Sequence, residues 1–213
     1  MRDRLLESAL VVFTHHGLDA SLIDQVIRTA DVSRGTFYNY FRTHEELISG
    51  LANAVGSEII RLIDPIAASH ANPAVRVACG VQLAFQVALQ HPTLAAFVVK
   101  GGVLALRTSS LATEVVSRDL QAGIDAGEFS VSSLELGLDL VIGPVLSGFY
   151  TLLSHDIGPS FVTDLATSIL QSLGVPHAKA RRYVAQHAGA FDIPEDSLFV
   201  RATKRAHQIA SAE

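Results

Sequence analysis

The stretch that decides the fold is SLIDQVIRTADVSRGTFYNYFRTHEE, residues 21–46. Apolar residues before its turn recur at the spacing of one helical face: Ile23, Val26, Ile27 and Ala30. Ser33 then offers an N-cap for a second helix over 34–41, and Thr43 with Glu46 forms a capping box that opens a third. A helix, a four-residue turn and a short second helix make up a helix-turn-helix motif, whose second helix enters the DNA major groove.

The second helix of this stretch divides into two faces. Phe37, Tyr40 and Phe41 share one face and are expected to turn inward. The face left to solvent carries polar side chains: Arg34, Thr36, Tyr38 and Asn39. Arginine pairs with guanine or phosphate, asparagine with adenine, and hydroxyl groups reach phosphates, so this face suits DNA. The alternative is an ordinary helical corner in a core, with a solvated polar face.

Residues 32–41, VSRGTFYNYF, resemble the most recognisable string of the N-terminal DNA-binding domain of the tetracycline-repressor (TetR) family, and the resemblance begins at Gly17. Four positions depart from the residues that the family commonly has: Leu22, Ile27, Asp31 and His44. Aspartate enters the left-handed region more readily than most residues, so it is tolerable in the turn. Leu22 and His44 each replace a residue type that is expected to contact a DNA phosphate in the family.

The resemblance implies a three-helix DNA-binding domain over residues 1–46, with a first helix at 2–16, and double-stranded operator DNA as its partner. The residues that it implies for DNA binding are Arg28, Ser33, Arg34, Gly35, Thr36, Tyr38, Asn39, Tyr40 and His44. The charge does not favour this role, because the chain has a net charge of −5 and residues 1–60 carry five arginines against eight acids. DNA binding therefore requires the few positive groups to gather on one face.

The rest of the chain also has a helical pattern, and no convincing strand alternation interrupts it, so the predicted fold class is all-α. A helix over 43–63, ending before Pro65, is expected to link the DNA-binding domain to a second domain at 47–175. The further helices expected there have their boundaries at caps, prolines and glycines: 73–90, 92–100, 109–126, 132–153 and 160–173. Residues 176–213 form a helical extension, with helices expected at 177–189 and 195–211.

The composition indicates a soluble cytoplasmic protein. Hydrophobic residues make up 49% of 213 residues, which is ample for a core. The single cysteine, Cys79, excludes an intrachain disulfide and fits a reducing compartment, and no secretory signal opens the chain. The apolar stretch 131–153 is broken by Glu135 and Asp139, which leaves 14 uncharged residues where a bilayer needs about 20.

The resemblance implies that the second domain binds an effector and forms a homodimer. The helices at about 131–153 and 160–173 would form a four-helix dimer interface, the alternative being a core within one chain. The apolar candidates for the effector cavity are Val81, Phe85, Leu89, Phe97, Leu104, Leu120, Ile124 and Phe149, and the polar candidates are Gln82, Gln86, Arg107 and Tyr150. Few charged residues fall in these helices, which favours an apolar or weakly polar effector.

The function that these patterns predict is a ligand-responsive transcriptional regulator, usually a repressor in the family, that leaves a palindromic operator when its effector binds. No enzyme activity, cofactor or metal is expected, because no catalytic triad order, phosphate loop or metal-ligand spacing is present in the sequence. The competing class is an all-α small-molecule-binding protein or enzyme without a DNA role. The extension is expected to pack on the rest, because several of its residues need cover: Tyr183, Val184, Phe191, Leu198 and Phe199.

Overall fold

The computed structural model describes residues 1–16, 23–92, 95–99, 110–186, 189 and 191–210. Within these ranges the regular structure is helical and no strand occurs, which confirms the all-α prediction. The helices are α1 (Arg2–His16), α2 (Ile23–Ala30), α3 (Arg34–Tyr38), α4 (His44–Ala67), α5 (Pro73–Gln90), α7 (Ser110–Asp125), α8 (Leu134–Ser154), α9 (Phe161–Ser172), α10 (His177–Val184) and α11 (Leu198–Ala210). Most bounds lie within two residues of the predicted ones.

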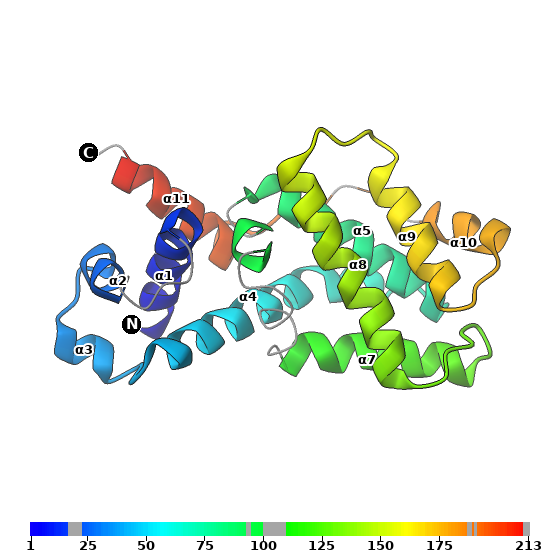
Figure 1. Ribbon diagram of the computed structural model, residues 1–213, viewed down its shortest axis with the longest axis horizontal. Helices are drawn as coiled ribbons and strands as arrows, with labels where there is room; N and C mark the ends of the chain where they lie inside the picture. The colour runs from blue at the N-terminus through cyan, green and yellow to red at the C-terminus, as the bar shows by residue number, and fades with distance from the viewer. Residues whose placement is uncertain (17–22, 93–94, 100–109, 187–188, 190, 211–213) are drawn as a thin grey trace.

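Helices α1, α2 and α3 form a small unit at one end of the molecule, called here the N-terminal unit (Figure 1). Its core contains the buried rings of Phe13, Phe37 and Phe41. The turn between α2 and α3 is closed by Asp31, whose φ of 50° lies in the left-handed region that aspartate tolerates. Its carboxylate also pairs with Arg4 of α1 at 3.2 Å, so the residue that replaces the usual glycine ties the turn to the first helix.

Helix α4 leaves this unit and runs into the larger part of the molecule, called here the main body. The predicted N-cap at its start is present, because Thr43 Oγ1 accepts from the Glu46 N–H at 3.2 Å. The second half of the capping box is shifted by one residue, since the Glu46 carboxylate accepts from the Arg42 N–H at 2.7 Å and not from the N–H of Thr43. The predicted end before Pro65 is wrong, since the helix continues to Ala67. A proline in the last turn removes a single N–H donor, and the following turn still closes.

The main body consists of α4, α5, α7, α8, α9 and α10, with α5 at its centre (Figure 1). Asn72 caps α5 by accepting from the Ala74 and Val75 N–H groups, and Pro73 occupies the first turn, as the sequence predicts. Helix α5 packs against α4, α7, α9 and α10 and is therefore buried on almost every side.

The predicted extension at 176–213 divides between two places. Helix α10 packs on α5 and α9 of the main body, whereas α11 lies against α1, where the red and blue ends of the chain meet in Figure 1. Tyr183, Val184, Leu198 and Phe199 are buried and Phe191 is half-buried, which confirms that the extension packs. The C-terminal part of the chain thus returns to the N-terminal unit instead of covering only the main body.

Helix α8 is the most apolar element of the main body. By length and composition it could cross a membrane, and only 28% of its most apolar window is buried. Three large apolar side chains stand exposed on it: Leu136, Tyr150 and Leu153. An exposed apolar face of this kind is typical of interaction surfaces.

Candidate nucleic-acid interface and internal pocket

Helix α3 presents its polar residues to solvent. Ser33 caps it by accepting from the Thr36 N–H at 3.0 Å, and the hydroxyls of these two residues lie 2.9 Å apart. Phe37 is fully buried and anchors the helix in the N-terminal unit. The predicted DNA-binding residues Arg28, Ser33, Arg34, Gly35, Tyr38 and Asn39 are exposed, and Thr36 is half-buried. One anchored face and one free polar face are the arrangement that a recognition helix needs.

Tyr40 does not turn inward as predicted, because its side chain is 44% exposed. Helix α3 ends at Tyr38, with Asn39 as its C-cap, so the helical period that would place Tyr40 beside Phe37 stops before reaching it. Tyr40 therefore stands in the turn after α3, on the accessible side of the unit. Phe41 does turn inward and is buried.

His44 lies differently from the other predicted DNA-binding residues. Its ring packs edge-on against Phe13, with the centroids 5.8 Å apart. Its Nε2 atom is buried and has no hydrogen-bond partner among the described residues. The imidazole therefore faces the inside of the N-terminal unit, and this position does not favour the DNA contact that the resemblance implies for it.

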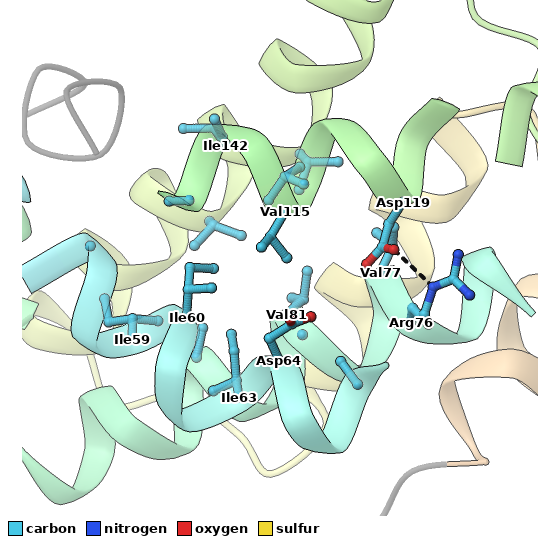
Figure 2. A pocket seen from close by; sticks show the side chains of 18 of the residues that line it. Ile59, Ile60, Ile63, Asp64, Arg76, Val77, Val81, Val115, Asp119 and Ile142 are labelled. Carbon is cyan, nitrogen blue, oxygen red and sulfur yellow. Dashed lines mark hydrogen bonds and ion pairs between the residues drawn. The ribbon is translucent and has the colours of Figure 1, made fainter. Parts of the chain in front are cut away.

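A pocket with a volume of about 120 Å³ lies inside the main body, between α4, α5, α7 and α8. Figure 2 shows aliphatic side chains from these helices pointing into it. Its lining is Gly56, Ile59, Ile60, Ile63, Asp64, Ala67, Arg76, Val77, Gly80, Val81, Ala84, Ala112, Val115, Val116, Asp119, Val141, Ile142, Val145 and Phe149. The wall is apolar apart from three charged residues, so shape and hydrophobic contact dominate what the pocket can hold.

The charged residues of the pocket belong to one ion-pair network. Arg76 Nε donates to Asp119 Oδ1 at 2.8 Å, the contact drawn as a dashed line in Figure 2. Arg118 donates to Asp64 at 2.7 Å and to Asp119 at 3.0 Å, and these hydrogen bonds, chiefly the one to Asp64, raise the pKa of the Arg118 guanidinium above the usual range. Asp119 is only 5% exposed, and its charge is balanced within the network. These carboxylates and the Arg76 guanidinium supply the hydrogen-bonding groups of the pocket.

The pocket wall differs from the cavity predicted from the sequence. Of the predicted residues that the structure describes, only Val81 and Phe149 line it. Gln82 donates to Val184 O at 3.2 Å and Gln86 to Gly189 O at 2.9 Å, so both amides hold the C-terminal part of the chain on α5. Phe85, Phe97 and Leu120 are core residues, Ile124 is half-buried, and Leu89 and Tyr150 are 55% and 56% exposed. Leu22, Leu104 and Arg107 lie outside the described residues.

The predicted and observed pocket walls differ on α5, which has apolar residues on nearly every side. Val77, Gly80, Val81 and Ala84 face the pocket, while Gln82, Phe85 and Gln86 face away from it. When a helix is apolar on two faces, the spacing of its hydrophobic residues does not show which face lines a pocket. The signal that could have located the pocket is the short set of charges in otherwise apolar helices: Asp64, Arg76, Arg118 and Asp119.

An outward-facing recognition helix joined by α4 to a helical body with an internal pocket defines a one-component transcriptional regulator. Two family models match the chain: residues 5–51 match the bacterial regulatory proteins of the tetR family, and residues 72–186, more than half of the chain, match the tetracyclin repressor-like C-terminal domain. The chain therefore belongs to the TetR family of transcriptional regulators.

Solved structures with the same fold include RolR in two states and the transcriptional regulator FadR. RolR without ligand is 23% identical with a TM-score of 0.70, over 89% of this chain and 99% of RolR. RolR in complex with resorcinol is 24% identical with a TM-score of 0.73, over 90% and 96%. FadR from Bacillus subtilis in complex with stearoyl-CoA is 18% identical with a TM-score of 0.64, over 80% and 96%. No functionally curated protein sequence matches the chain.

Proposed function

We propose that this protein is a ligand-responsive repressor that binds a palindromic DNA operator as a homodimer and leaves it when a small effector enters the pocket. The observation that carries the DNA-binding part is α3, where a fully buried Phe37 holds exposed Arg34, Tyr38 and Asn39 outward. These side chains suit guanine, phosphate and adenine contacts. The DNA-binding domain, the effector-binding domain with its linking helix, and the extension keep their proposed ranges of 1–46, 47–175 and 176–213.

The exposed apolar face of α8 supports the homodimer. Leu136, Tyr150 and Leu153 lie on a helix that is mostly unburied within one chain, and α9 packs beside it. A second copy would cover this face by two-fold symmetry, which is the commonest symmetry of soluble oligomers. The same symmetry would present two α3 helices to successive major grooves roughly 34–36 Å apart. The proposal includes a cytoplasmic location, because a DNA-binding dimer acts where its operator is.

The volume of the pocket favours a compact effector. An engineered protein cavity of about 150 Å³ binds benzene, so a pocket of about 120 Å³ suits a single ring. The ligand of RolR, resorcinol, is of this size, whereas the stearoyl-CoA held by FadR is far larger. Asp64, Arg76 and Asp119 at the wall would hydrogen-bond ring hydroxyls. We therefore favour a small aromatic ring with hydroxyl groups as the effector class.

Helix α4 provides the link from effector to DNA, because it lines the pocket with Ile59, Ile60 and Ile63 and begins next to α3. An effector that binds better when the two N-terminal units are out of groove register will favour that state. By linkage, operator DNA must weaken effector binding by the same factor.

The test of DNA binding uses DNA from upstream of the protein's own coding region, labelled and titrated by fluorescence anisotropy. We expect Arg34→Ala and Tyr38→Ala to lose about tenfold or more in operator affinity each, since a good base or phosphate contact contributes about 1–3 kcal/mol. The control is Arg182→Ala, which removes an exposed arginine of α10 at the other end of the molecule. Equal affinity of wild type and both α3 variants would refute the role of α3.

The competing function, a small-molecule-binding protein without a DNA role, predicts a different pair of results. It would give effector binding in the pocket with no salt-dependent binding to upstream DNA. The slope of operator affinity against salt separates the two, because each phosphate contact adds to it.

A further inference from the structure

Helix α11 packs along α1 of the N-terminal unit, and its first residues contact α4 of the main body (Figure 1). Leu198, Phe199 and Ala202 are buried there, so the helix is docked by apolar contact as well as by polar groups. Neither family model includes it, since they end at residues 51 and 186. Helix α11 is therefore an addition to the two matched regions, and it contacts both.

The start of α11 and the side that carries Phe199 and Thr203 are attached to two helices that line the pocket, α4 and α5. The Leu198 N–H donates to Glu58 Oε1 at 2.9 Å, and Glu58 precedes the pocket residue Ile59 on α4. At the end of α5, His91 packs on Phe199 with ring centroids 6.0 Å apart, and its Nδ1 lies 3.4 Å from Thr203 Oγ1. A displacement of α4 or α5 at the pocket thus reaches α11 directly.

The opposite side of α11, which carries Arg201 and Arg205, is attached to the N-terminal unit. Arg201 forms an ion pair with Glu7 of α1, whose side chain is only 13% exposed. Arg205 donates to the carbonyl oxygen of Thr29 in the last turn of α2. The carbonyls of a last helical turn have no partner within the helix, so this arginine satisfies one that would otherwise be free. Thr29 lies just before the turn that leads to α3.

We propose that α11 is a positioning element for the DNA-binding helix: it fixes the angle of the N-terminal unit relative to the pocket helices, with Arg201 and Arg205 as its positioning residues. The N-terminal unit is joined covalently to the rest only through α4, which leaves its angle to be set by non-covalent contacts. Because α11 holds α1 and α2 on one side and α4 and the end of α5 on the other, a change at the pocket moves the unit as a rigid body. The consequence for operator binding rests on the proposed function, whereas the docking of the unit does not.

The docking is tested by amide hydrogen exchange on the full-length chain. Glu7→Lys and Arg201→Glu each place like charges together, and we expect amide exchange in α1 and α2 to rise about tenfold relative to wild type. The charge-swapped double variant Glu7→Lys/Arg201→Glu restores the attraction and should return exchange to near the wild-type rate. Lys204→Ala is the matched control on the same helix, because Lys204 is exposed and, within the described part of the chain, its ion pair is with Glu195 in the preceding segment.

The amides of α5 and α9 serve as the internal reference for global stability. Wild-type exchange in α1 and α2 of both single variants would overturn the proposal, as would a rise that extends equally to α5 and α9. Should the charge variants fail to fold, Thr203→Val is the deciding variant, because it keeps the shape of the side chain and removes the hydroxyl that contacts His91 and donates to the Phe199 carbonyl within α11. We expect it to raise exchange in α1 and α2 about threefold and to leave α9 unchanged; an unchanged α1 would overturn the proposal.

The same variants test the link to DNA. We expect Arg201→Glu to weaken binding to the upstream DNA about tenfold, the charge-swapped variant to recover it, and the dimer measured by light scattering to stay intact. Weak binding by the charge-swapped variant, despite restored protection of α1 and α2, would overturn the positioning role in DNA binding. If the wild type itself does not bind the DNA, the proposed function fails while the exchange experiment still decides how the N-terminal unit is held.

Discussion

Arg34 pairs with Asp24 at 2.8 Å, and both side chains are exposed, 70% and 57%. An ion pair this exposed contributes little to stability, at most about 1 kcal/mol, so its guanidinium is available to a stronger partner. A phosphate or a guanine edge offers two acceptors in the plane of the guanidinium. The ion pair therefore orients Arg34 on the surface of the N-terminal unit in the absence of DNA, and it is weak enough for DNA to replace it.

His91 is the residue whose ionisation the fold perturbs near neutral pH. Burial against α11 lowers its pKa below the ordinary value, so the folded protein holds it neutral. As the pH falls through about 6.5 the unfolded chain takes up the proton first, which means that stability present above that pH is lost below it. We expect the melting temperature to fall from pH 7.5 to pH 5 and this fall to be smaller in His91→Gln. Equal slopes in calorimetric scans of the two proteins would contradict the assignment.

At the scale of the helix, two glycines of the main body give a matched comparison. A Cβ at Gly80 of α5 would meet nothing within 4 Å, whereas a Cβ at Gly148 of α8 would lie 2.5 Å from Phe85 Cζ and 2.7 Å from Leu165 Cδ2. Gly80→Ala should stabilise the protein by about 1 kcal/mol through helix propensity, and Gly148→Ala should destabilise it by about 1–3 kcal/mol through overpacking. Urea unfolding measures both, and shifts of the same sign would contradict the packing of α8 on α5.

The pocket provides a second prediction for α5. Gly80 lies on the wall with open space before it, so Gly80→Leu should fill part of the pocket without a clash in the empty protein. We expect millimolar resorcinol to raise the melting temperature of the wild type but not of Gly80→Leu, and stearoyl-CoA to raise neither. Gly80→Ala is the control, since it leaves most of the pocket open. Stabilisation of Gly80→Leu by resorcinol would place the site elsewhere.

Dimer formation is predicted to depend on the exposed apolar face of α8. Tyr150→Asp with Leu153→Asp puts two charges on this face, and we expect the variant to be monomeric by light scattering while its helix content is unchanged. Its operator affinity should fall by at least about a hundredfold, because two linked recognition helices bind far more tightly than one. Leu89→Asp is the control, as an equally exposed apolar residue of α5. A dimeric double variant would move the interface away from α8.

The part of the fold that local chemistry specifies was predictable from the sequence. Ser33, Thr43 and Asn72 each accept a backbone hydrogen bond at the helix start predicted for them, because a cap interacts only with its own first turn. The prediction at Pro65 was wrong for a related reason, since a proline near a helix end costs one hydrogen bond that the packed main body tolerates. The same local patterns also predicted the exposed polar residues of α3.

The sequence by itself determined that the chain is helical, where its helices begin, and that a recognition helix of the TetR type is anchored by Phe37. Only the tertiary structure decided that Val77, Gly80 and Val81 rather than Gln82 and Phe85 face the pocket, and that α11 returns to α1. The physical reason is the separation along the chain of the residues that interact. Caps and hydrophobic periods act within a few residues, whereas the choice between two apolar faces, and the docking of a helix nearly 200 residues from its partner, depend on which surfaces meet when the chain is packed.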